Sequence, residues 1–182
     1  MNVEDMAAFR CARLLLLLDL VRHETPEGVD AERLGVYDFL AAHPLLLARD
    51  QDDPDRMTLL MAGFDDRALS YSSAGQRFVT AQQHLSRDLT VLVRSGLVTM
   101  AVGGRIRYRL TDDGRDAAGR LTAAYARSYV TAAAIIVRRM KRLSGRRMRE
   151  ALRRCFPAPA IADIAVAALT DILPAPDIEG PT

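Results

Sequence analysis

The fold of this chain is decided by residues 78–114, which read FVTAQQHLSRDLTVLVRSGLVTMAVGGRIRYRLTDDG. Apolar side chains recur at helical spacing in the first half of this stretch and predict a helix over about residues 76–95 with one buried face. These side chains are Ala81, Leu85, Leu89 and Leu92. Gly96 is expected to end the helix. Residues 97–102 and 105–110 then read as two short strands, and the Gly-Gly pair between them favours a tight hairpin.

The residues after the hairpin indicate another helix. Thr111 or Asp112 fits the N-cap position, where a short polar side chain accepts a hydrogen bond from the first turn. The alanine-rich segment that follows predicts one long helix from Asp113 to Leu143. A helix, a glycine stop, a hairpin and a further helix are typical of a winged helix-turn-helix domain. We therefore predict a mainly α fold with a two-stranded β-hairpin wing and a long C-terminal helical extension.

Two further helices are expected before the winged part. A leucine-rich helix over about residues 5–22 is apolar nearly all round at its centre, which predicts burial on several sides. A second helix is expected to begin at Asp30 as N-cap and to end at Ala42, before Pro44. The predicted organisation is a winged-helix domain with N-terminal helices over residues 1–121, a long basic helical extension over 122–156, and a short apolar helix with a proline-rich tail over 157–182.

Charge is distributed unevenly along the 182 residues, although the formal net charge is only +2. Residues 138–154 carry nine basic side chains against Glu150 alone. This segment fits contact with DNA phosphates, contact with an acidic partner, or a solvated helix surface. Residues 49–66 are rich in aspartate but lack the glycine and terminal glutamate of an EF-hand calcium loop. They favour a solvated acidic connection that contains a short helix.

The sequence contains two cysteines and three histidines, none in a spacing that indicates a disulfide, a metal site or a catalytic group. We therefore expect a protein that is not an enzyme and needs no cofactor or metal. The apolar run from Leu14 to Leu18 is far shorter than the ~20 residues that a membrane span requires. Glu4 and Asp5 also stand where a secretory signal is basic. These features predict a cytoplasmic protein with no membrane partner.

Exposed polar and basic side chains are the candidate binding residues. In a winged domain, the helix can enter a DNA groove while the hairpin contacts the backbone. Strand alternation places three arginines of the second strand on one face of the hairpin. The candidates are Gln83, Arg87, Thr90 and Arg94 on the helix, Arg105, Arg107 and Arg109 on the strand, and Arg138, Arg139, Arg142, Arg146 and Arg147 in the basic segment. Such a surface suits DNA phosphates and base edges, and contact with a protein is the competing use.

Two resemblances to known families rest on these residues. The stretch YRLTDDG, from Tyr108 to Gly114, resembles small bacterial regulators of the MarR and PadR kind, and it is common to many winged proteins. From about Arg13 to Leu121 the chain resembles the middle component of bacterial ABC-three-component systems. The segments that carry this resemblance are RLLLLLDL (13–20), DAERL (30–34), YDFL (37–40) and His43-Pro44, followed by the leucine-rich winged part.

The second resemblance implies an accessory subunit encoded beside an SMC-like or RecN-like ABC ATPase and an effector, in systems similar to Lamassu-type anti-phage defence. In that setting the winged domain would bind the ATPase, and the family offers no catalytic residues to carry over. This is our leading hypothesis. The alternative is a dimeric transcriptional regulator, in which the long helix from Asp113 provides the homodimer contact and residues 83–94 enter a DNA groove.

Overall fold

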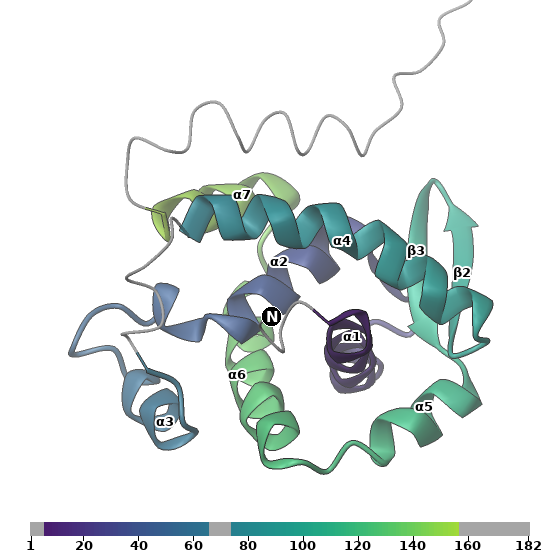
Figure 1. The fold of residues 1–182 in the computed structure, drawn as a ribbon. Coiled ribbons are helices and arrows are strands. Elements are labelled where there is room, and N and C mark those ends of the chain that lie inside the picture. Colours follow the sequence, from purple (N-terminus) through teal and green to yellow (C-terminus); the bar gives the residue numbers. More distant parts are fainter. Residues whose placement is uncertain (1–5, 66–73, 157–182) are drawn as a thin grey trace, which may run out of the picture.

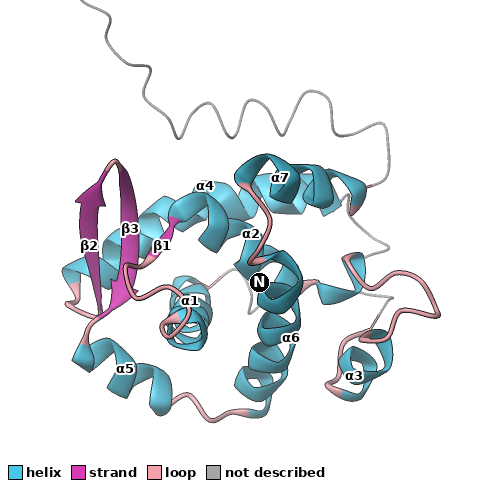
Figure 2. Cartoon of the chain, turned by 180° about the vertical axis from the view of Figure 1, so that it is seen from behind, coloured by secondary structure: helices cyan, strands magenta, loops and turns pink. Residues whose placement is uncertain are grey.

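The computed structural model describes residues 6–65 and 74–156, and it is mainly helical with a small antiparallel sheet (Figure 2). The elements follow the chain in the order α1 (Ala7–Val21), β1 (Val29–Asp30), α2 (Ala31–Ala42), a 3-10 turn (Pro44–Leu46), α3 (Arg56–Met61), α4 (Ala74–Arg94), β2 (Val98–Gly103), β3 (Arg105–Leu110), α5 (Asp112–Gly119), α6 (Ala124–Met140) and α7 (Gly145–Arg154). The helix predicted over residues 76–95 and both predicted strands are confirmed.

The sheet has the strand order β1-β3-β2, and both of its pairings are antiparallel. Gly104 lies at the tip of the β2–β3 hairpin with a φ of +78°, a conformation that glycine adopts without steric cost. β1 pairs with β3 through Val29 opposite Tyr108. The sequence analysis did not predict β1, because a strand of two residues is too short to show alternation.

α1 forms the centre of the core. In Figure 1 it is seen nearly end-on, inside a ring made by α2, α4, the hairpin, α5 and α6. Leu14 and Leu17 are at most 1% exposed, which confirms the expected burial of this leucine-rich helix on several sides. The surrounding helices contribute aromatic and aliphatic side chains to the same buried cluster. These include Leu34 and Leu40 of α2, Phe78, Leu89 and Leu92 of α4, and Tyr129, Ile136 and Met140 of α6.

Side-chain caps and one glycine fix the helix ends that the sequence indicated. Asp30 caps α2 by accepting the backbone N–H of Arg33 at 2.8 Å. Thr111 caps α5 by accepting the N–H of Gly114 at 3.0 Å. Gly96, with a φ of +73°, follows the end of α4. These caps satisfy backbone donors that have no partner inside the helix.

The prediction of one long helix from Asp113 to Leu143 is wrong. The chain forms α5 and α6, with a break over residues 120–123. Alanine propensity favours a continuous helix, but a continuous helix would carry the apolar side of α6 away from the core. The break turns α6 back, so that Tyr129 and Ile136 become fully buried beside α1.

α7 also packs on the same core. Met148 and Leu152 are buried in the cluster that contains the leucines of α1. Figures 1 and 2 show α7 alongside the first half of α4, and Phe156 lies 5.8 Å from Phe78 between ring centroids. The expected extension over residues 122–156 therefore folds against the helices that precede it. The apolar helix predicted after residue 157 lies outside the described residues.

Candidate functional site

The exposed face of α4 carries the predicted polar row. Gln83, Arg87, Thr90 and Arg94 are all exposed, opposite the buried side chains of the same helix. Asp88, the only acidic residue in the α4 sequence, is 2% exposed and points into the core. The outward face of α4 therefore presents cations and hydrogen-bonding groups without a carboxylate of its own.

The hairpin presents two chemically different faces. Residues directly opposite each other in an antiparallel pair share a face, so Arg105, Arg107 and Arg109 lie on one face of β3, beside the small residues of β2. Arg107 donates to Glu27 at 2.8 Å, while Arg105 and Arg109 are exposed. Strand alternation predicted that the three arginines share a face, and the register of β3 confirms it.

The opposite face of the hairpin is apolar and solvent-exposed. Met100, Val102 and Ile106 are 50%, 85% and 49% exposed. Val102 stands opposite Ile106 in the strand register, and Met100 stands opposite the half-buried Tyr108. This face continues outward from the buried Val98 and its partner, the partly buried Leu110. The alternation of apolar residues shows that these side chains share one face of the hairpin. It does not show that this face is exposed, because it does not say how much of each strand the core covers.

The basic segment is partly neutralised by the acidic connection. Arg139 donates to Asp53 at 2.9 Å and to Asp55 at 2.7 Å, and Arg138 donates to Asp55 at 2.5 Å. The hydrogen bond from Arg139 lowers the pKa of Asp53, and both arginines lower the pKa of Asp55 against the opposing effect of its partial burial. The prediction of a solvated acidic connection is therefore wrong for these two aspartates, although the short helix predicted there is present as α3.

The other three candidate residues of the basic segment lie in α7 or just before it. Arg142, Arg146 and Arg147 are exposed, and Arg146 lies 3.8 Å from Glu150 within α7. Elsewhere in the segment, Lys141 pairs with Glu24 and Arg149 with Glu32. Much of the basic segment is therefore engaged in internal ion pairs, whereas the α4 row and the hairpin arginines lie on elements that follow each other directly along the chain.

Two ion pairs, one partly buried and one buried, could not be seen in the sequence pattern. Arg10 donates to both carboxylate oxygens of Asp88, at 2.6 and 3.1 Å, and this bond raises the pKa of Arg10. Each pair joins α1 to another helix across the core. The only sequence signal is a charged residue within an apolar helical stretch, and this signal does not identify the partner.

The second ion pair belongs to a buried group of three residues. Arg13 donates to Asp38 at 2.7 Å, and the Tyr129 hydroxyl donates to the other oxygen of Asp38, also at 2.7 Å. Burial opposes the charged form of Arg13, but Asp38 raises its pKa above the ordinary value. Burial also raises the pKa of Tyr129, and Asp38 adds to that rise. The group ties α1, α2 and α6 together and is closed to solvent, which marks it as structural.

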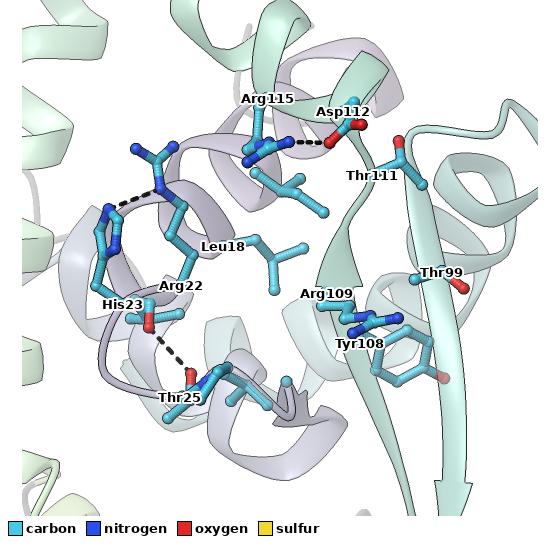
Figure 3. A pocket seen from close by; sticks show the side chains of 15 residues that line it. Leu18, Arg22, His23, Thr25, Thr99, Tyr108, Arg109, Thr111, Asp112 and Arg115 are labelled. Carbon is cyan, nitrogen blue, oxygen red and sulfur yellow. Dashed lines mark hydrogen bonds and ion pairs between the residues drawn. The ribbon is translucent and has the colours of Figure 1, made fainter.

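A surface hollow of about 640 Å³ lies between the end of α1, the base of the sheet and the start of α5 (Figure 3). Leu18 and Val21 contribute apolar side chains, and Arg22, Arg109 and Arg115 contribute cations. Its volume is typical of small-molecule sites. Arg115 is held by Asp112, and Arg22 by Asp19 and His23, so two of the three cations already have partners.

No group of three or more His, Cys, Asp or Glu side chains in residues 6–65 and 74–156 could hold a metal ion. Within the same ranges, no helix combines the length and the apolar character needed to cross a bilayer. The chain matches no protein-family model, and searches of curated proteins and of solved structures find no similar protein.

Proposed function

We propose that this chain is a winged-helix accessory subunit, without enzymatic activity, that binds an SMC-like or RecN-like ABC ATPase in an anti-phage system with a separate effector. The order α1, β1, α2, α4 and then the β2–β3 hairpin supports a winged helix-turn-helix domain, as does the strand order β1-β3-β2. The departure is residues 43–73, which carry α3 and stand where such motifs use a turn of about 3–4 residues.

The observation that carries this proposal is the exposed apolar face of the hairpin. Contiguous apolar surface rimmed by polar groups is typical of protein interaction sites. The basic face of the hairpin, where Arg105 and Arg109 are exposed, is able to contact DNA phosphates. Phosphate contact does not account for the opposite face, on which Val102 is 85% exposed and Met100 and Ile106 are about half exposed. The apolar face of the hairpin is therefore better suited to a protein surface than to a DNA backbone.

Two further observations reduce the support for a dimeric DNA-binding regulator. The long helix that would provide its dimer contact is absent, and α6 is instead buried against α1 and α2. Arg138 and Arg139 are engaged by aspartates, which lowers the number of cations that the basic segment can offer to phosphates. Two observations still favour the regulator, namely the exposed row of Gln83, Arg87, Thr90 and Arg94 on α4 and the exposed Arg105 and Arg109 on the hairpin.

The test is a pull-down of the tagged full-length chain from its native host, after nuclease treatment, read by mass spectrometry. We expect an SMC-like or RecN-like ATPase in the eluate of the wild type. A variant with Val102→Glu and Ile106→Glu should lose at least nine-tenths of the ATPase, whereas the matched control with Arg87→Ala and Arg94→Ala should retain it. Recovery of the chain alone, with DNA lost on digestion, would contradict the proposal.

The regulator hypothesis has its own measurement. Replacing Arg87 and Arg94 with alanine should then weaken binding to the protein's own promoter more than binding to random DNA, because base contacts carry sequence preference and phosphate contacts do not. Equal losses on both DNAs would argue against sequence reading.

A further inference from the structure

β2 is an open edge of the sheet. Within residues 6–65 and 74–156, the strand order β1-β3-β2 leaves its outer side without a strand partner, and Figures 1 and 2, which view the molecule from opposite sides, both place β2 at the margin. It packs against β3 and α4. An open edge presents unpaired N–H and C=O groups at every second residue, and such groups can pair with another chain.

This edge lacks the features that usually protect an open strand. Its sequence, VTMAVG, contains neither a charged residue nor a proline. Its pairing with β3 runs without a bulge from Val98 opposite Leu110 to Gly103 opposite Arg105. Natural edge strands usually carry a lysine, a proline or a bulge to prevent pairing. The exposed part of β2 is therefore suited to receive a strand.

The two faces of the hairpin define the chemistry of that strand. On one face, an added strand would extend the apolar layer of Met100, Val102 and Ile106. On the other face, the side chains of the added strand would face Arg105 and Arg109 of β3 across the small residues of β2. An added strand would lie about 10 Å from β3, which is twice the strand spacing of about 4.8 Å, and an extended arginine and glutamate together can span this gap.

We propose that β2 binds an extended segment of the partner protein as a fourth strand, and that this segment alternates apolar and acidic residues. The inference rests on the proposed function, since it specifies how the accessory subunit contacts its partner. Backbone pairing supplies affinity in such strand addition, and the alternating side chains supply specificity. A carboxylate-bearing strand complements the basic face formed by Arg105 and Arg109.

A second copy of this chain fits the edge less well. Pairing two β2 edges about a twofold axis would place the two apolar faces side by side and leave both exposed. It would also place no acidic residue beside the basic face, because VTMAVG contains none. The charge pattern therefore favours a different, acidic partner.

The probe is the capped peptide VEVEVEVE, added to the full-length protein and followed by amide hydrogen exchange and two-dimensional NMR. Strand addition should slow exchange at alternate amides of residues 98–103, because only every second N–H of an edge strand points outward. VKVKVKVK should bind at least tenfold more weakly, as should VVVVEEEE, which has the same composition without the alternation.

Matched variants locate the site on the hairpin. Val102→Lys, at a position that is 85% exposed, should weaken binding of VEVEVEVE at least tenfold without affecting the circular dichroism spectrum. Val91→Lys introduces the same charge at an exposed valine of α4 and should have no effect. Replacing both Arg105 and Arg109 with alanine should remove the preference for glutamate over lysine.

Four results would overturn the inference. The first is no detectable binding of VEVEVEVE at 1 mM, a concentration on the order of the weakest specific affinities. The second is equal binding of VKVKVKVK, and the third is binding that protects no amide of β2. Self-association that Val102→Lys abolishes would also overturn it, by making a second copy the occupant. If the ATPase still co-purifies while the peptide does not bind, the proposed function stands and only strand addition fails.

Discussion

Replacing Gly114 with alanine should destabilise the protein, although helix propensity predicts the opposite. Gly114 is the third residue of α5, and alanine is favoured over glycine by about 1 kcal/mol inside a helix. A Cβ at this position, however, would lie 2.0 Å from the carbonyl oxygen of Leu97 and 3.1 Å from a methyl carbon of Leu110. The first contact is with backbone, which cannot rotate away as a flexible side chain can.

The size of the destabilisation depends on the contacts that are lost when α5 moves to make room for the added Cβ. The Leu97 carbonyl accepts the N–H of Thr111 at 3.1 Å, so moving α5 away weakens the bond that closes the base of the hairpin. Overpacking costs about 1–3 kcal/mol, and loss of a hydrogen bond costs about 1 kcal/mol. The gain in helix propensity offsets the loss of the hydrogen bond, so we expect a net loss of about 1–3 kcal/mol in the free energy of unfolding.

Urea denaturation followed by circular dichroism at 222 nm would measure this loss. Gly119→Ala is the matched control, because it lies in the same helix with no atom within 4 Å of the added Cβ. The control should be as stable as the wild type or up to about 1 kcal/mol more stable. A Gly114→Ala variant whose unfolding free energy equals or exceeds that of the wild type would refute the reasoning.

Other predictions concern buried groups. Asp38→Ala should cost about 3–5 kcal/mol in urea denaturation, because it leaves Arg13 buried without a counter-charge; a loss below about 1 kcal/mol would count against this. Burial, aided by nearby arginines, lowers the pKa of His43 to about 4, so the unfolded chain, in which histidine titrates near 6.5, takes up the proton first. The free energy of unfolding should therefore be highest above pH 6.5 and should fall by roughly 3 kcal/mol as the pH drops toward 4. The His43→Gln variant should show a smaller dependence on pH in this range. Burial raises the pKa of Cys155 to about 11 and also raises that of Cys11, so neither thiol should react with a colorimetric thiol reagent at pH 8 until urea is added, and a fast native reaction would contradict their burial.

The local features of this protein could be predicted from its sequence. The caps at Asp30 and Thr111, the end of α4 at Gly96 and the tight turn at Gly104 all depend on residues within a few positions of each other. The buried face of α4 follows from helical spacing in the same way. Such features need no knowledge of which distant segments meet.

The candidate surfaces were predicted only in part. Helical spacing placed Gln83, Arg87, Thr90 and Arg94 on one exposed face, and strand alternation placed the hairpin arginines together. Neither pattern revealed that the opposite face of the hairpin is exposed, because burial depends on how far the core extends along β2 and β3. The open edge of β2 likewise depends on the position of β1, which is too short to predict.

The tertiary structure alone decided the pairing of distant charges and the course of the chain after residue 119. Arg139 meets Asp53 across 86 residues, and Tyr129 meets Asp38 across 91. Those contacts exist because α6 turns back, although its alanine-rich sequence favours continuing the preceding helix. Helix propensity is worth less than 1 kcal/mol per residue, roughly, whereas burying a large apolar side chain contributes about 1.5–3 kcal/mol. The burial of α6 in the core therefore outweighs the local preference, and only the folded arrangement of the whole chain determines which apolar surfaces that burial leaves uncovered.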